Sequence, residues 1–447
     1  MTILSEQTAK TLLTKVIAFS KADAVECNLD GSVGGNIRYA RNTVSTAGEE
    51  SDVTLAVQST FGKRMGVATI NEFDDASLEK VVRRSEELAK LAPENEEMMP
   101  NFGKQTYLES KTFFESTSKV TPEDRAQAAQ NSIAPSKKDK LVAAGFLEEN
   151  TRFTAIMNNS GLFAYNTSTN VDFSVTIRTE DGKGSGWVTR NYSDVKLLDT
   201  AKASSIAIHK AKSSVDAKEM EPGKYTVILE PAASNTLISN MMRSFNQRGA
   251  DEGRSFLSYK PKEGEDLEKA PKNKLGMKMF DERVHIYSDP QHPIAPVAPF
   301  GSDGFPRQRI DWIKDGTVVN MPNSPYWAKK TGMPYIPSGG NIIMSGGSQS
   351  LEDMIKSTRR GVLVTRLWYI RSLDPQTLLY TGLTRDGTFY IENGKIKYPI
   401  KNFRFNESPI VMLNNIEALG EPQRIDGDMI PPMKIRDFTF SSLSDAV

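Results

Sequence analysis

The sequence has few of the residues that most often build metal and nucleophile sites. Its 447 residues include one cysteine and three histidines, so the chain cannot form an internal disulfide. The zinc and redox patterns HxxxH, HExxH and CxxC are absent, and so is the GxSxG motif of serine hydrolases. The residues alone therefore predict neither a zinc site nor a serine nucleophile.

The sequence also lacks an excess of either charge and any long apolar run. Its 56 basic residues balance 56 acidic ones, which gives no reason to expect nucleic acid or an anionic membrane surface as a partner. No window approaches 18 uninterrupted apolar residues, and the first residues show no signal-peptide pattern. We expect a cytoplasmic protein without a membrane span, long enough for two or more domains.

The first half combines helix and strand patterns. Helix starts are predicted at Ser5, at Asp74 or Asp75, and at Thr121, which precedes Pro122. Cys27 shares an alternating face with Val25 and Leu29, which indicates a core side chain rather than a nucleophile. Strands are expected at residues 22–29, 37–44, 53–59 and 64–70, a connector at 93–120, an antiparallel meander at 141–192, and a helix at 199–213. Residues 1–220 are thus predicted to form a mixed α/β domain with its helices on one side.

The second half begins with a buried strand at residues 225–229 and a central helix at 231–247. Pro231 opens this helix, and Gly249 and Gly253 are expected to end it. Its apolar stripe is Leu237, Ile238, Met241, Met242 and Phe245. A charged loop at 258–275, a strand at 361–365 and a hairpin at Asn393-Gly394 follow. Residues 221–447 are predicted to form a largely antiparallel, barrel-like β domain, which makes the fold class α+β.

Short motifs along nearly the whole chain resemble those of the TldD/PmbA family, in the same order. They are ADAVE (22–26), RYARN (38–42), GKRMGVA (62–68), GRSF (253–256), DGFP (303–306), IKDG (313–316), WAKKTG (327–332), TG (381–382), GTFYIENGKI (387–396) and NNIEALG (414–420). Each motif is weak alone, but their shared order is specific. The family is also called the modulator of DNA gyrase family and is peptidase U62-like, although the charge balance lends no support to a gyrase role.

The resemblance also assigns the chain to one branch of the family. TldD-like peptidases carry HExxxH on the central helix, where two imidazoles hold zinc and a carboxylate acts as base. The matching positions here are near Ser239, Asn240 and Ser244, which supply neither imidazole nor carboxylate. The C-terminal residues 425–440 also lack the cysteine ligand of that branch. The resemblance therefore implies the TldE/PmbA branch, with no metal or other cofactor in this chain and zinc in a partner subunit.

Seven family-like positions carry side chains able to hold a peptide backbone or terminus. They are Arg243, Arg254, Ser255, Asp303, Asn341, Thr381 and Arg385. Loop and barrel scaffolding is the alternative role for the same residues. An extended peptide could also pair with an exposed strand edge, which requires few special side chains.

Three functions stay open. The first is a non-catalytic subunit that pairs with a TldD-like zinc peptidase, so that the heterodimer encloses a cavity and cleaves small or unfolded peptides. The second is a stand-alone peptidase or hydrolase, for which His285, Asp289 and His292 are the best candidates, although a surface role is their alternative. The third is a homodimeric peptide-binding scaffold. His209, on a predicted helix, is expected to be structural.

Overall fold

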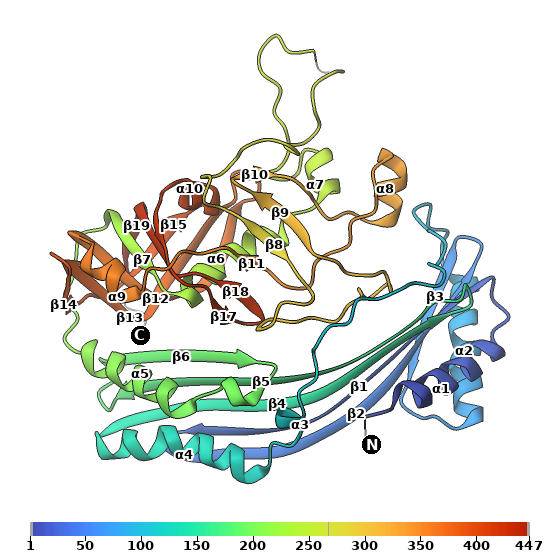
Figure 1. The fold of residues 1–447 in the computed structure, drawn as a ribbon, viewed down its shortest axis with the longest axis horizontal. Helices are drawn as coiled ribbons and strands as arrows, with labels where there is room; N and C mark the ends of the chain where they lie inside the picture. The colour runs from blue at the N-terminus through green and yellow to red at the C-terminus, as the bar shows by residue number, and fades with distance from the viewer. Residues whose placement is uncertain (1–2, 267, 445–447) are drawn as a thin grey trace.

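The computed structural model describes residues 3–266 and 268–444. Figure 1 shows a long sheet built by the first half of the chain, with the second half lying above one part of it. Among the described residues, no helix combines the length and the apolar character needed to cross a membrane. The predicted boundary near residue 220 stays a prediction.

The first half forms a six-stranded antiparallel sheet in the order β3-β2-β1-β4-β5-β6. Its strands are β1 (Ala24–Ala40), β2 (Thr43–Phe61), β3 (Arg64–Ile70), β4 (Leu141–Asn158), β5 (Phe163–Thr179) and β6 (Ser185–Tyr192). The meander predicted for residues 141–192 is confirmed as β4, β5 and β6.

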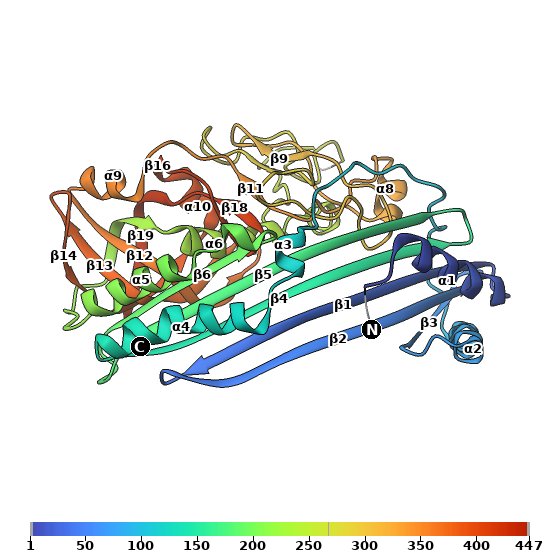
Figure 2. The same ribbon diagram turned by 60° about the horizontal axis from the view of Figure 1, so that its bottom comes forward.

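Four long helices pack on one face of this sheet. They are α1 (Glu6–Phe19), α2 (Asp75–Leu91), α4 (Pro122–Lys138) and α5 (Thr200–Ser213), and the short elements are α3 (Glu115–Ser118) and η1 (Val195–Leu197). Figure 2 shows α1 and α2 at one end and α4 and α5 toward the other, and each pair has its own apolar cluster. The predicted caps are confirmed at Ser5, Asp74 and Thr121, and Cys27 is fully buried in the core.

The strand predicted at residues 37–44 is wrong. Ala40 pairs with Thr43, so the chain reverses at Arg41 and Asn42, which both have positive φ angles of 49° and 61°. The side chain of Asn42 accepts a bond from the backbone N–H of Ala143 and donates one to the carbonyl of Leu141, each at 2.7 Å. The turn is thus fixed by contacts with a distant strand, which local sequence patterns do not reveal.

The face of the sheet opposite the helices is polar and half-buried along much of its length. On β1, β4 and β5 it carries Asn28, Asp30, Ser32, Asn36, Asn150, Arg152, Thr154, Asn166, Ser168, Asn170 and Asp172. The second half of the chain covers this face at β6, where Ser185 donates a hydrogen bond to Asp386 and Trp187 stacks on Arg366. Phe300 and the connector residues Phe102 and Tyr107 cover it again at Ile156 and Ala164, whereas Asp30 and Arg152 on the same face are exposed.

The outer edge of β2 has no neighbouring strand along much of its length. Because β3 pairs with β2 only from Leu55 onward, no strand in the described part of the chain pairs with the outer side of residues 43–54. Residues 43–52 are exposed throughout and include Glu49, Glu50 and Asp52. This edge is therefore long, accessible and acidic.

The second half is built around a closed barrel. Its strands are β7 (Gly223–Leu229), β12 (Arg360–Asp374), β13 (Leu379–Glu392), β15 (Asn402–Glu407) and β19 (Met433–Ser444), with β14 (Lys395–Pro399) and β16 (Ile416–Leu419) attached. They run in the order β12-β7-β19-β15-β13, and the pairing of β12 with β13 closes the ring. All pairs in it are antiparallel except β7 with β12. The predicted α+β class with a barrel-like second domain is confirmed, although the strand expected at 361–365 extends to Asp374.

A second, small sheet was not predicted. It contains β8 (Ile286–Ser288), β9 (Ile310–Lys314), β10 (Thr317–Val318), β11 (Ile343–Met344), β17 (Gln423–Ile425) and β18 (Asp428–Ile430). Around it and the barrel lie the short helices α8 (Pro325–Thr331), α9 (Leu351–Lys356) and α10 (Pro409–Asn414). The segment 258–275 extends out from this half at the top of Figure 1, and residue 267 within it lies outside the described residues.

The central helix is shorter than predicted. Helix α6 (Pro231–Arg243) ends before Phe245, and a separate helix α7 (Gln247–Asp251) follows. The break has a local cause, because the side chain of Asn246 accepts a hydrogen bond from the N–H of Gly249 at 2.7 Å and so caps a new helix. The expected end at Gly249 is therefore wrong, and Gly253, at φ 77°, ends α7 instead.

Candidate functional site

The side chains at the three positions that match the metal motif make hydrogen bonds mainly within α6. Ser239 donates to the side-chain oxygen of Asn235 at 2.8 Å and lies 3.4 Å from Asp428. The amide of Asn240 donates to a backbone carbonyl one turn earlier at 2.7 Å, and Ser244 is 3.5 Å from the carbonyl of Asn240. These side chains thus belong to the helix and its neighbour β18.

The groups present do not fit a zinc ion. Zinc sites in proteins use imidazole, thiolate and carboxylate ligands, whereas Ser239, Asn240 and Ser244 offer two hydroxyls and an amide. Among the described residues, no three His, Cys, Asp or Glu side chains are grouped so that they could hold a metal. No chemical step on this chain is therefore derived through a metal.

Two of the three histidines make local contacts. His285 lies 3.1 Å from Asp311, and Nδ1 of His292 accepts hydrogen bonds from the N–H groups of Ile294 and Ala295. Burial lowers the pKa of His292, which agrees with an acceptor nitrogen. The structure does not combine His285, Asp289 and His292 into a metal-holding group within the described residues. His209 is exposed on α5.

A cavity of about 260 Å³ lies at the C-terminal end of α6. Its walls come from α6, the small sheet, and the loop that leads into β11. Among the residues that line it are Met242, Arg243, Trp312, Asn341, Ile342 and Asp428. The structure therefore brings two of the seven predicted peptide-binding residues, Arg243 and Asn341, to one place. Asp428 is the residue that the sequence analysis missed.

The cavity carries two opposite charges that lack ionic partners. Arg243 is exposed, and within the described residues it makes no hydrogen bond or ion pair. Asp428 accepts a hydrogen bond from the N–H of Ile342 at 2.8 Å and forms no ion pair among the described residues. Burial, with a smaller contribution from the nearby carboxylate of Asp426, raises the pKa of Asp428 to about 6, although the charge of nearby Arg424 slightly opposes this rise. This carboxylate is poised to bind a cation.

The charge of Asp428 should cost the protein stability. Since its pKa is about 6 when folded and 3.8 ordinarily, the folded protein holds a proton that the unfolded chain has lost between these pH values. The contribution of Asp428 to the free energy of unfolding therefore falls as pH rises from about 4 to about 6. We predict that Asp428→Asn unfolds like the wild type near pH 3.5 and is more stable by about 1–2 kcal/mol at pH 7.5, measured by urea unfolding.

The matched control for this prediction is Asp374→Asn. Hydrogen bonds, first from Thr377 and then from Gln376, lower the pKa of the partly exposed Asp374. Its contribution to stability is present at neutral pH and is lost as pH falls, so this substitution should destabilise at pH 7.5. An Asp428→Asn variant that is less stable than the wild type at pH 7.5 would contradict the prediction.

Asn341 shapes the cavity from behind. It is 3% exposed, and its amide nitrogen donates to the carbonyls of Asp289 and Ala295 at 2.8 and 2.7 Å. Its oxygen accepts from the N–H of Asp289 at 3.0 Å. With these bonds made, Asn341 holds two loops together and acts on a ligand only through the wall that it fixes.

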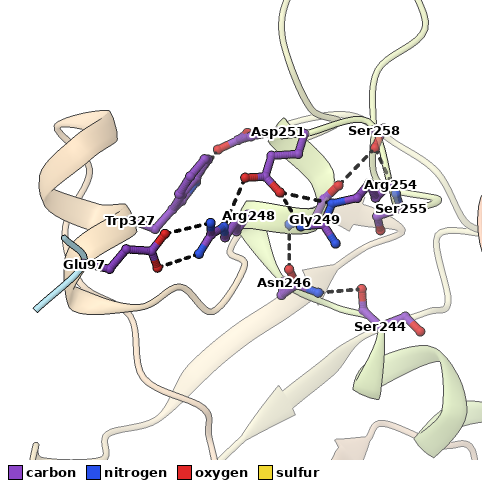
Figure 3. A network of polar contacts seen from close by, with 11 residues as sticks. Glu97, Ser244, Asn246, Arg248, Gly249, Asp251, Arg254, Ser255, Ser258 and Trp327 are labelled. Carbon is purple, nitrogen blue, oxygen red and sulfur yellow. Dashed lines mark hydrogen bonds and ion pairs between the residues drawn. The ribbon is translucent and has the colours of Figure 1, made fainter. Parts of the chain in front are cut away.

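Arg254 and Ser255 lie elsewhere, in a polar network around α7 (Figure 3). Arg254 forms an ion pair with Glu252, and the hydroxyl of Ser255 accepts a hydrogen bond from the N–H of Leu257 at 3.2 Å. Both residues close the turn after α7. In the described part of the chain, neither is among the residues that line the cavity.

The same network links α7 to the connector that follows α2 in the first half of the chain. Both carboxylate oxygens of Glu97 accept hydrogen bonds from Arg248, at 2.7 and 2.8 Å, and the guanidinium lies 5.1 Å from the ring of Trp327 (Figure 3). The indole N–H of Trp327 donates to Asp251 at 2.7 Å. These contacts fix α7 and α8 against the first half of the chain.

The remaining three predicted residues have structural partners. Asp303 accepts hydrogen bonds from the N–H of Phe305 at 3.0 Å and the hydroxyl of Tyr335 at 2.5 Å. Thr381 donates to the carbonyl of Phe405 at 3.0 Å, and the guanidinium of Arg385 lies 4.0 Å from the ring of Trp368. Of the residues described, none of these lines the cavity.

Family models match most of the chain. PmbA/TldA metallopeptidase domain 1 matches residues 29–89, the central domain of that family matches 115–215, and its C-terminal domain matches 222–442. The metalloprotease PmbA of Escherichia coli O157:H7 is 28% identical over 174 residues. That alignment covers 36% of this chain and only 37% of the length of PmbA.

Solved structures share the whole fold. TldE from Thermococcus kodakarensis superposes with a TM-score of 0.84 at 19% identity, over 98% of this chain and 100% of that one. Proposed modulators of DNA gyrase from Bacteroides thetaiotaomicron VPI-5482 and Thermotoga maritima MSB8 give TM-scores of 0.85 and 0.83 at 19% and 16% identity. They cover 99% and 97% of this chain and 100% of their own. At such identities the likeness shows the fold alone.

Proposed function

This chain belongs to the PmbA/TldD metallopeptidase family, as its motifs predicted, and from this premise we propose that it is the non-catalytic subunit of a two-subunit peptidase. The partner would be a TldD-like zinc peptidase that supplies the metal and the catalytic base. This chain would supply one part of the chamber wall and of the path taken by small or unfolded peptides.

The observation that supports the proposal is that the central helix α6 keeps its buried apolar side but carries no side chain that can bind zinc. Strand β7 leads directly into α6, and the stripe of Leu237, Ile238 and Met241 is fully buried. The framework that presents a metal helix is therefore present. The positions that would face a metal hold Ser239 and Asn240, whose side chains bond within the helix instead.

The polar face of the first sheet supports a role beside a water-filled chamber. A peptide in extended conformation presents backbone N–H and C=O groups that need hydrogen-bonding partners. Half-buried amides and hydroxyls along β1, β4 and β5, such as Asn28, Asn150 and Ser168, can supply them. Because this face lies opposite α1, α2, α4 and α5, it is free to line such a space (Figure 2).

Co-purification with metal analysis tests the proposal. The full chain is expressed alone and together with a TldD-like peptidase of the same organism, and zinc and cleavage of an unfolded peptide are measured. We expect little zinc and no cleavage from the chain alone, and zinc with cleavage from the pair. A partner without its zinc-binding histidines, still paired with this chain, serves as control and should be inactive.

Stoichiometric zinc in the isolated chain, or peptide cleavage by it, would contradict the proposal. If the chain sediments as a dimer with itself and does not bind the peptidase, the homodimeric scaffold is the correct reading. The cytoplasmic location stays a prediction, and the experiment does not depend on it.

A further inference from the structure

We propose that the cavity at the end of α6 binds short peptides as zwitterions, with the terminal ammonium at Asp428 and the terminal carboxylate at Arg243. The inference rests on the proposed function, because it specifies how this subunit would hold the ends of peptides. It concerns one cavity of this chain and involves no metal.

The two charged groups are placed by positions on α6 that are four residues apart. Asp428 lies beside Ser239 on α6, and Arg243 follows Ser239 by four residues. Four residues of an α-helix advance about 6 Å along its axis. Each extended residue spans about 3.3–3.6 Å, so a dipeptide is about as long as this separation, and the exposed side chain of Arg243 can adjust to its carboxylate. A longer peptide would need to leave the cavity at one end.

The size and walls of the cavity favour a small ligand with apolar side chains. Its volume of about 260 Å³ lies just below the range of about 300–1,000 Å³ that is typical of pockets for drug-sized ligands. Met242, Phe245, Trp312 and Ile342 provide apolar walls, and Phe245 and Trp312 are 2% and 3% exposed. These side chains are already held by the core, so little ordering is needed on binding.

Both charged groups suit the ends of a peptide. Asp428 is oriented by the N–H of Ile342, lies 3.4 Å from the hydroxyl of Ser239, and forms no ion pair among the described residues. An ammonium ion would compensate the charge that burial makes costly. The guanidinium of Arg243 presents N–H groups in a planar fork that matches a carboxylate.

A zwitterionic peptide is the kind of product that the proposed peptidase reaction would release. Hydrolysis of a peptide bond releases a new ammonium and a new carboxylate, so short products carry both charges at neutral pH. A site for zwitterions therefore selects products, or the ends of short substrates, over the interior of a long chain. Bound in this way, a dipeptide would occupy the non-catalytic subunit and leave the partner free.

Calorimetric titration of the full chain with four probes tests the proposal. The probes are Leu-Leu, N-acetyl-Leu-Leu, Leu-Leu amide and the doubly blocked N-acetyl-Leu-Leu amide. We expect each single block to weaken binding by about tenfold, since each removes one charge-assisted contact. Asp428→Asn should bind Leu-Leu and N-acetyl-Leu-Leu equally, whereas Arg243→Gln should bind Leu-Leu and Leu-Leu amide equally.

Asp426→Asn is the matched control. Asp426 lies on the same hairpin as Asp428, and its pKa is also raised by burial, but it is not among the described residues that line the cavity. This variant should still bind Leu-Leu more tightly than N-acetyl-Leu-Leu and more tightly than Leu-Leu amide. The proposal is overturned if the wild type binds the doubly blocked peptide as well as Leu-Leu, or if Asp428→Asn weakens all four probes by one common factor. Zinc content and pairing with the peptidase are separate readouts, so either idea can fail without the other.

Discussion

Replacing Asp386 by alanine is expected to lower the free energy of unfolding by about 3–5 kcal/mol, because it leaves a half-buried guanidinium without its partner. The side chain of Asp386 is 0% exposed and lies 2.5 Å from Arg366. Its other oxygen accepts a hydrogen bond from Ser185 of β6 at 2.5 Å. Arg366 in turn stacks on Trp187, 4.2 Å from its ring centre. One carboxylate thus joins the barrel to the first sheet.

Two further variants isolate the charge. Asp386 has a positive φ of 56°, a conformation that Asn adopts more readily than Ala, so Asp386→Asn separates the ionic loss from backbone strain and should cost less than Asp386→Ala. Glu115→Ala breaks the ion pair of Glu115 with Lys119, whose side chains are 73% and 71% exposed, and should cost far less than Asp386→Ala because exposed ion pairs add little stability. Urea unfolding followed by tryptophan fluorescence measures all three. Equal costs for Asp386→Ala and Glu115→Ala would contradict the prediction.

Gly66→Ala should destabilise the protein by about 3 kcal/mol, because helix α2 leaves no room for a side chain there. A Cβ at Gly66 would lie 2.2 Å from the backbone nitrogen of Ala89 and 2.4 Å from the backbone oxygen of Ser85. Backbone atoms cannot rotate away, so α2 must shift from the sheet. That movement would expose the buried Leu78 and Val82, and thermal unfolding would show it as a lower Tm.

Gly48→Ala provides the control for Gly66→Ala. Gly48 lies in the exposed part of β2, its φ is not positive, and no heavy atom comes within 4 Å of a Cβ built there. Its substitution should change stability by less than about 0.5 kcal/mol. If both alanine variants unfold at the same temperature, the close approach of α2 is not what determines stability at Gly66.

Local chemistry made part of the fold predictable. Helix starts at Ser5, Asp74 and Thr121 depend on side chains that bond to the backbone three residues later, so the signal lies within one turn. The Asn393-Gly394 turn likewise requires two positive φ angles, of 50° and 75°, that this pair adopts easily. The long amphipathic helices and alternating strands carry their periodicity in the sequence in the same way.

The small sheet had no such signal. Its strands contain between two and five residues, which is too short for a periodic pattern to show. Ile343 pairs with Tyr287 on one side and with Met429 on the other, so partners come from segments far apart in the chain. Only the folded chain reveals such pairings.

The candidate site could be predicted only in part, because its residues also come together from segments far apart in the chain. The resemblance supplied Arg243 and Asn341 as positions along the chain, but it also supplied Asp303 and Arg254, which the fold places elsewhere. Asp428 begins β18 directly after the turn at Asp426 and Gly427, where acidic residues are ordinary. Its importance comes from burial beside α6, which depends on residues almost two hundred positions away.

The accessible acidic edge of β2 affects how copies of this protein behave in concentrated solution. Unpaired strand edges are the places where sheets join into larger aggregates, and like charges along an edge oppose that joining. Glu50 and Asp52 give every copy the same repulsive border, whereas the charge of Glu49 is partly offset by Arg125 at 3.2 Å. At an ionic strength of about 0.1 M, salt largely screens the repulsion between exposed charges that are more than about 10 Å apart. The solubility of the protein should therefore be greatest at low salt concentration.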